Sequence, residues 1–205
     1  MKGKEEDIPG VFAPDSRLYG VTYSEWTVRW WQWCLSQPKS TNPVNDRKRT
    51  DRNAANNQIY PDVWFLAGTT GGYAERECTI PRGKAILSPI INFEISTAED
   101  PNLKTDEELS SFARADVDKI AKLNVTIDGI SLPDPKKFRV ESRPFHVRLP
   151  EENIWGVKKG PTRAAGDGYW LFLKPLPRGS HHIQFGGSCL AGTINIGTIY
   201  YLTVQ

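Results

Sequence analysis

Three histidines are the residues of this 205-residue chain best suited to acid–base or metal chemistry. His181 and His182 are adjacent, and adjacent side chains of a β-strand point to opposite faces, so the pair cannot hold one metal ion together. A metal site would have to combine His181 or His182 with His146 or with a carboxylate such as Glu94. We therefore expect no metal and no cofactor, and a structural role for His181.

A catalytic interpretation draws on the same part of the chain. A hydrolase or a metal-dependent enzyme would have its site around His181, His146, Asn92 and Glu94. The sequence contains no Gly-x-Ser-x-Gly elbow, phosphate-binding loop or dinucleotide fingerprint. A Pro-x-Gly-x-x-His stretch ending at His182 matches part of a cupin-type metal motif, but the His-x-His…Glu half is missing. The sequence leaves open whether the chain is an enzyme.

The cysteines indicate neither a disulfide framework nor a zinc site. Cys34, Cys78 and Cys189 are three in number, so at most one pair can form within the chain, and none of them shows CxxC spacing. We expect each of them to be a buried thiol.

Tryptophan is unusually abundant, with seven residues, and several of them follow a helical period. Trp26, Trp30, Trp33 and Cys34 are spaced i, i+4, i+7 and i+8, which places them on one face of a helix over residues 23–36. Thr22 with Glu25 three positions later predicts a capping box at its start. The first expectation is that this apolar face is core.

The alternative is an aromatic platform for sugars or other flat ligands. Its candidate residues are the exposed members of the helical group together with two indoles from predicted strands, namely Trp26, Trp30, Trp64 and Trp170.

The elements that position these residues are mainly strands. Short apolar or alternating runs recur from residue 62 onward, separated by turn residues, and the chain has 17 Gly and 15 Pro. We expect a hairpin over residues 77–95 and about nine strands in all. The fold class is therefore mainly β, a β-sandwich or jelly roll with a Trp-rich N-terminal helix and one inserted amphipathic helix. Thr105 and Glu108 predict a second capping box, at the start of that inserted helix over residues 105–122.

We expect a single domain over residues 1–205, with an extended N-terminal segment at 1–18 and a long polar loop at 37–60. That loop contains a basic run, Arg47, Lys48, Arg49 and Arg52, with Asp46 and Asp51 in the same stretch, which is typical of a solvated loop. The alternative for this run is the binding of phosphate or a polyanion.

The net charge of +2 and the lack of an 18-residue apolar run give no reason to expect nucleic-acid binding or a membrane span. The charged N-terminal residues contain no hydrophobic stretch of the kind found in a signal peptide. A homo-oligomer formed by pairing of edge strands is possible on physical grounds, because such strands carry unpaired backbone groups.

Several segments together resemble a family of uncharacterised bacterial and archaeal proteins. The resemblance covers most of the chain and is carried by YGVTYSEW leading into WWQW, and by segments 63–69, 78–85, 89–92, 167–170 and 177–187. The family brings no established activity, but its members carry secretion signals, which implies an exported protein. This chain has no cysteine near Ala54 or near Ile95, where the resemblance leads us to expect one, and it has Gln184 in place of a second histidine.

These observations lead to a functional expectation and an alternative. The expectation is a β-sandwich binding or structural module for an unidentified ligand, either a carbohydrate or another protein. The alternative is the hydrolase or metal-dependent enzyme with a site near His181 and His146.

Overall fold

The structure is a computed structural model that describes residues 10–50, 52–189 and 194–205. Residues 1–9 of the predicted N-terminal segment lie outside this range. The described chain forms two main sheets, which confirms the mainly β prediction. The five-stranded sheet has the order β4 (Gly72–Ile80), β11 (Ile194–Val204), β10 (Gly179–Cys189), β6 (Ile120–Ile127) and β7 (Ile130–Ser131). The four-stranded sheet has the order β3 (Val63–Phe65), β5 (Ala85–Ser96), β9 (Gly160–Leu173) and β8 (Ser142–Leu149).

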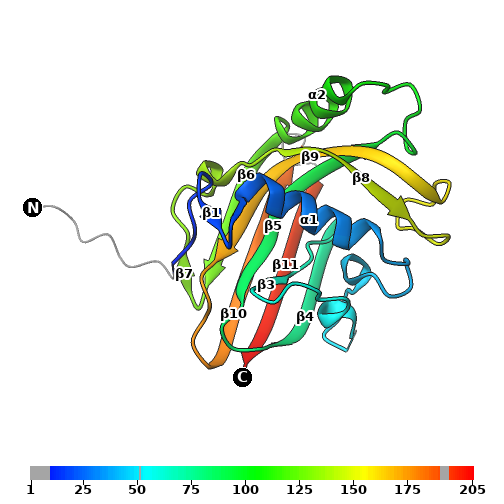
Figure 1. Ribbon diagram of the computed structural model, residues 1–205. Coiled ribbons are helices and arrows are strands. Elements are labelled where there is room, and N and C mark those ends of the chain that lie inside the picture. The colour runs from blue at the N-terminus through cyan, green and yellow to red at the C-terminus, as the bar shows by residue number, and fades with distance from the viewer. Residues whose placement is uncertain (1–9, 51, 190–193) are drawn as a thin grey trace, which may run out of the picture.

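The remaining elements are short or lie on the outside of these sheets. Strands β1 (Arg17–Leu18) and β2 (Val21–Thr22) pair with each other, and there are 3-10 turns at η1 (Pro43–Asn45), η2 (Asn53–Ala55) and η3 (Pro135–Phe138). Helix α1 (Tyr23–Leu35) crosses the four-stranded sheet on the side facing away from the five-stranded sheet (Figure 1). Neither described helix is long and apolar enough to cross a membrane.

The space between the two sheets is filled by alternate side chains of their strands. Ile86, Leu171, Ile183, Phe185 and Leu202 are each at most 1% exposed and belong to one continuous apolar cluster. Because side chains alternate across a strand, the residues between them point away from this core. These intervening side chains form the outer faces of the two sheets.

The indoles occupy a different layer from the one we expected. The sequence suggested that they fill the space between two sheets, but most of them lie between α1 and the outer face of the four-stranded sheet. Trp170 and Phe172 of β9 point to this side and meet Trp26 and Trp30 of the helix. Trp64 is the exception, since it belongs to the core between the sheets.

Both predicted capping boxes are present. The Thr22 hydroxyl accepts from the Glu25 backbone N–H at 3.2 Å, and the Glu25 carboxylate accepts from the Thr22 N–H at 2.9 Å. Thr105 and Glu108 form the same arrangement at the start of α2 (Asp106–Val117). In both helices this side-chain pair satisfies backbone donors that have no partner within the helix.

Helix α2 ends earlier than its apolar pattern predicted. Residues 120–122 belong to β6, where Ile120 pairs with Cys189 of β10. A ladder of backbone hydrogen bonds to a distant strand replaces the last turn of the expected helix. Phe112, an apolar residue of α2, is 42% exposed.

The hairpin expected over residues 77–95 is also wrong. The Pro-Arg-Gly turn at 81–83 carries the chain from β4 in one sheet to β5 in the other. The second Pro-Arg-Gly, at 177–179, likewise connects β9 to β10 across the two sheets, and both connections lie at the lower end of Figure 1. The repeated Pro-Arg-Gly sequence therefore occurs at two connections in which the chain passes from one sheet to the other.

The polar segment 37–60 packs against the sheets instead of extending into solvent. Asn42 is fully buried and its amide donates to the Cys34 carbonyl at 2.7 Å, which closes the C-terminal end of α1. Asp46 is 2% exposed and its carboxylate accepts from the backbone and the side chain of Asn53. Such contacts explain why a stretch without hydrophobic periodicity is ordered.

Candidate functional site

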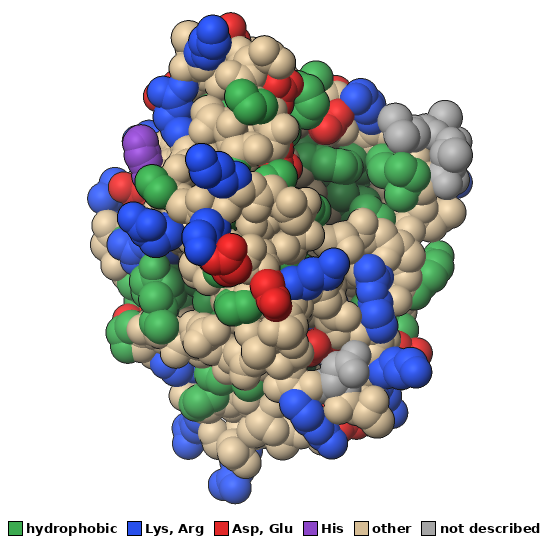
Figure 2. Space-filling model, turned by 90° about the vertical axis from the view of Figure 1, so that its right-hand side faces the viewer, with side chains coloured by type: hydrophobic (Ala, Val, Ile, Leu, Met, Phe, Trp, Pro, Cys, Tyr) green, Lys and Arg blue, Asp and Glu red, His purple; other side chains and the backbone are tan. Residues whose placement is uncertain are grey.

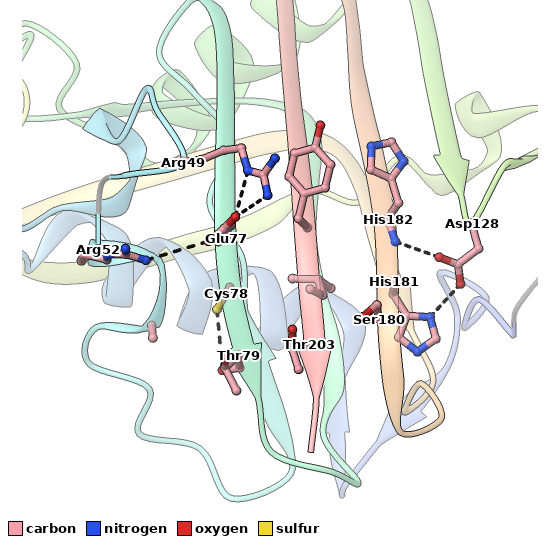
Figure 3. Close-up of a pocket in the computed structure, with 13 residues that line it drawn as sticks. Arg49, Arg52, Glu77, Cys78, Thr79, Asp128, Ser180, His181, His182 and Thr203 are labelled. Atoms are coloured by element: carbon pink, nitrogen blue, oxygen red, sulfur yellow. Dashed lines mark hydrogen bonds and ion pairs between the residues drawn. The ribbon is translucent and has the colours of Figure 1, made fainter.

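A shallow hollow lies on the outer face of the five-stranded sheet, which neither α-helix covers (Figure 3). Its volume is about 720 Å³. Strand β4 shows how the sequence builds it, because its residues alternate strictly between buried and exposed from Ala74 onward. Glu77 and Thr79 therefore point outward beside Thr203 of β11 and Ser180 of β10.

An aromatic and basic cluster occupies the centre of the hollow. The guanidinium carbon of Arg49 lies 4.1 Å from the ring centroid of Tyr201, and the His182 ring lies 5.1 Å from that ring. Arg49 Nε donates to Glu77 Oε1 at 2.9 Å, and Arg52 Nη1 lies 3.9 Å from Glu77 Oε2. Three segments distant in the sequence thus present a ring, a cation and an anion side by side.

Asp128 organises the other edge of the hollow. It occupies the turn after β6 with φ of 50°, a conformation that Asp tolerates better than most residues. One carboxylate oxygen lies 2.7 Å from His181 Nδ1, and the other accepts from the His182 backbone N–H at 2.8 Å. His181 Nε2 lies 2.9 Å from the Pro177 carbonyl oxygen.

Both ring nitrogens of His181 face oxygen acceptors, so both bonds form together only when the imidazole is doubly protonated. Burial lowers the pKa of His181, but the Asp128 carboxylate and the Pro177 carbonyl raise it by more, and the net pKa lies above 6.5. A ring held by both nitrogens has no free lone pair for a metal ion or for general-base catalysis. His181 is therefore a structural residue in this geometry.

The His181–Asp128 pair predicts a pH-dependent stability. A pKa raised by folding contributes stability that is complete below the unfolded value of about 6.5 and is lost as pH rises through the folded value. We expect His181→Gln to destabilise the protein more at pH 6 than at pH 8.5, measured by urea unfolding. His146→Gln, at an exposed position of β8, controls for the substitution itself. An equal loss at both pH values for His181→Gln would contradict the charged pair.

The other residues of the catalytic alternative are dispersed. His146 is exposed on β8 of the four-stranded sheet, whereas His181 is on β10 of the five-stranded sheet. Asn92 and Glu94 lie on β5, on the side that faces α1. Among the described residues, no three His, Cys, Asp or Glu side chains are grouped so that they could hold a metal ion.

The four indoles proposed as a ligand platform are buried. Trp26 and Trp30 are each 2% exposed, Trp170 is fully buried, and Trp64 is 9% exposed. The indole N–H groups of Trp26, Trp30 and Trp170 donate to backbone carbonyls. The structure gives these four rings a core role, because covered faces cannot stack on a ligand.

The cysteines are free and buried, as expected. Burial raises the pKa of Cys78 to about 12, and it also raises the pKa of Cys34 and Cys189. A thiol with a raised pKa has little thiolate at neutral pH and is a poor nucleophile.

Sequence reasoning missed most of the hollow. Arg49 and Arg52 belong to a segment that the sequence indicated to be a solvated loop, and Asp128 was not a candidate site residue. The one usable signal was alternation, since Ser180, His182 and Gln184 share a face of β10. Nothing local indicated that this face would lie beside Tyr201 of β11.

Figure 2 shows Lys and Arg side chains interspersed with Asp and Glu side chains over the face it presents. This agrees with the net charge of +2.

Comparisons with known proteins do not assign a family. No family model matches the chain, and no curated protein matches it. One chain of a solved structure described as "Structure of PbICP-C in complex with falcipain-2" is similar at 12% identity and a TM-score of 0.29. The match covers 69% of this chain and 98% of that chain. A likeness of this size carries no functional argument.

Proposed function

We propose that the chain is a binding module of β-sandwich type, and that its ligand is a carbohydrate held in the hollow of the five-stranded sheet. The single observation that supports this most is the cluster of Arg49, Tyr201 and His182 on an open sheet face. The hollow, at about 720 Å³, lies within the range of roughly 300–1,000 Å³ that small-molecule sites occupy.

The chemistry of the lining favours a neutral, hydroxyl-rich ligand over a strongly charged one. Arg49 and Arg52 are opposed by Glu77, and His181 is opposed by Asp128, so opposite charges largely cancel. Hydroxyl groups of three further side chains project from the neighbouring strands, namely Thr79, Ser180 and Thr203. Donors and acceptors held on a rigid sheet around an aromatic ring can bind sugar hydroxyls with little loss of conformational entropy.

A glycan array followed by titration of the best ligand tests this proposal. We expect Tyr201→Ala to weaken binding at least about tenfold, because it removes the central ring and the surface on which Arg49 is placed. Gln184→Ala is the matched control, since Gln184 is exposed on the same strand and face as His182 but outside the hollow.

A blank array would contradict the carbohydrate ligand. Equal losses in Tyr201→Ala and Gln184→Ala would contradict the location of the site.

A further inference from the structure

A second, smaller cavity lies beneath α1, on the far side of the two sheets from the hollow. Its volume is about 70 Å³. The walls include Trp30, Trp31 and Cys34 of α1, Asn92 of β5, and Trp155 of the loop between β8 and β9. Trp155 is 37% exposed, so the cavity has an aromatic residue between its interior and solvent.

Two buried donors at this place have no hydrogen-bond partner among the described residues. They are Trp31 Nε1 and Asn92 Nδ2, and both residues line the cavity. Glu94 is held beside the cavity because one of its oxygens accepts from Trp155 Nε1 at 2.5 Å. Folded proteins rarely leave buried donors unsatisfied, so two such donors in one cavity indicate a group that is meant to be bound.

The backbone of β9 leaves room for these side chains. A Cβ atom at Gly166 would lie 2.6 Å from Trp31 Nε1, and one at Gly168 would lie 2.5 Å from the Asn92 Cβ. Both distances are shorter than real Cβ atoms show. Glycine at these two positions therefore lets the indole N–H and the amide lie directly over the strand.

A buried guanidinium group lies next to the residues that line this cavity. Arg76 is fully buried, and its Nη2 donates to the carbonyls of Val44 and Gly68, which both line the cavity. Its hydrogen bonds run to neutral oxygens, so its positive charge is not cancelled by these partners. In a low-dielectric interior such a charge favours an anion nearby.

Glu94 is kept neutral beside the cavity. Burial raises the pKa of Glu94 well above its usual range, and the neighbouring Glu99 raises it further. The carboxyl group of Glu94 is hydrogen-bonded to Glu99, so it adds neither a negative charge nor a free donor to the cavity. Two N–H groups and a nearby guanidinium are a set that recognises a carboxylate.

We propose that this cavity binds the carboxylate group of a small ligand through Trp31 and Asn92. The volume agrees with this, because at roughly 30 Å³ per water it holds about two water-sized groups, which is close to the size of a carboxylate. The site is separate from the hollow and does not depend on the carbohydrate proposal.

The test is a titration with sodium acetate followed in ¹⁵N–¹H spectra of the indole N–H groups, with sodium chloride at equal ionic strength as reference. We expect the signals of Trp31 and Trp155 to shift saturably with acetate. Those of Trp26 and Trp33, whose N–H groups donate to backbone carbonyls, stay in place. A Trp31 signal that does not respond saturably overturns the proposal.

Two substitutions locate the site. Trp31→Phe removes one donor to a charged group and is expected to weaken acetate binding about 10- to 100-fold. Asn92→Leu removes the amide donor at a similar volume and is expected to weaken binding at least about tenfold. If Trp31→Phe does not fold, Asn92→Leu alone decides. Unchanged affinity in both variants shows that acetate binds elsewhere and overturns the proposal.

Two further variants serve as controls. Trp33→Phe removes a buried indole N–H from the same helix outside the cavity, and we expect it to change affinity by less than about threefold. Glu94→Gln keeps a neutral side chain that can hydrogen-bond to Trp155 and Glu99, so we expect a similarly small effect. A loss of binding in Trp33→Phe as large as in Asn92→Leu contradicts the location of the site.

Discussion

Arg76→Met is expected to lower the free energy of unfolding by about 3 kcal/mol or more. Arg76 is 0% exposed on β4, and its guanidinium donates to the carbonyl oxygens of Val44, Asp46, Ala67 and Gly68. Methionine fills similar space but leaves these carbonyls without that donor, at roughly 1–3 kcal/mol each. Folding removes the Arg76 cation from water, which costs free energy. The methionine variant does not have this desolvation cost, and its absence offsets part of the loss of stability.

Urea unfolding measures the effect, with Arg82→Met as the control at an exposed position just after the same strand. Arg76→Lys should recover only part of the stability, because an ammonium cannot reproduce the planar array of five donors. If the free energy of unfolding of Arg76→Met lies within about 1 kcal/mol of the wild-type value, Arg76 is not the link between β4 and the polar segment 37–60.

The effect of Arg76 reaches the hollow. The segment anchored by Arg76 through Val44 and Asp46 continues directly into Arg49, which covers Tyr201. A loosened segment would let Arg49 move away from the ring. We therefore infer that the same buried guanidinium stabilises the fold and positions one wall of the proposed binding site.

Trp30→Ala is expected to destabilise the protein by about 3–5 kcal/mol, the range for truncation of a buried aromatic residue. Trp30 is 2% exposed and lies 5.0 Å from the Trp31 ring and 5.3 Å from the Trp170 ring, measured between centroids. Its Nε1 donates to the Leu66 carbonyl at 2.9 Å. Alanine would leave a cavity between α1 and the sheet and an unsatisfied carbonyl.

Thermal or urea unfolding compares Trp30→Ala with two other variants. Trp30→Phe keeps a ring but loses the N–H donor, and it should fall between the wild type and Trp30→Ala. Tyr73→Ala, at a position that is 74% exposed, should change stability by less than about 0.5 kcal/mol. Similar small losses in Trp30→Ala and Tyr73→Ala would contradict the core role of the indole layer.

Local features of the fold were predictable because they depend on residues close together in the chain. The capping boxes at Thr22 and Thr105 each involve side chains three positions apart. The alternation that turns His181 toward the core and His182 outward is a property of any strand. The C-terminal limit of α2 was not predictable, because Ile120 joins β6 through pairing with Cys189.

The candidate sites were predictable only as isolated residues. Asn92 and Glu94 were grouped with His181 and His146, but His181 is on the other sheet and His146 is on a different strand of the same sheet. Arg49 and Arg76 carried no local signal, since their partners come from Tyr201 and from backbone carbonyls elsewhere in the chain.

By itself, the sequence determined a mainly β chain with a capped, Trp-rich helix, because these features arise from periodicity and short-range hydrogen bonds. Tertiary structure alone decided that the indoles lie between α1 and one sheet, and that both Pro-Arg-Gly turns cross between sheets. It also decided which polar groups meet, because the pairing of β4 with β11 joins segments more than a hundred residues apart. Such pairing depends on the packing of the whole chain, which the local pattern of residues does not specify.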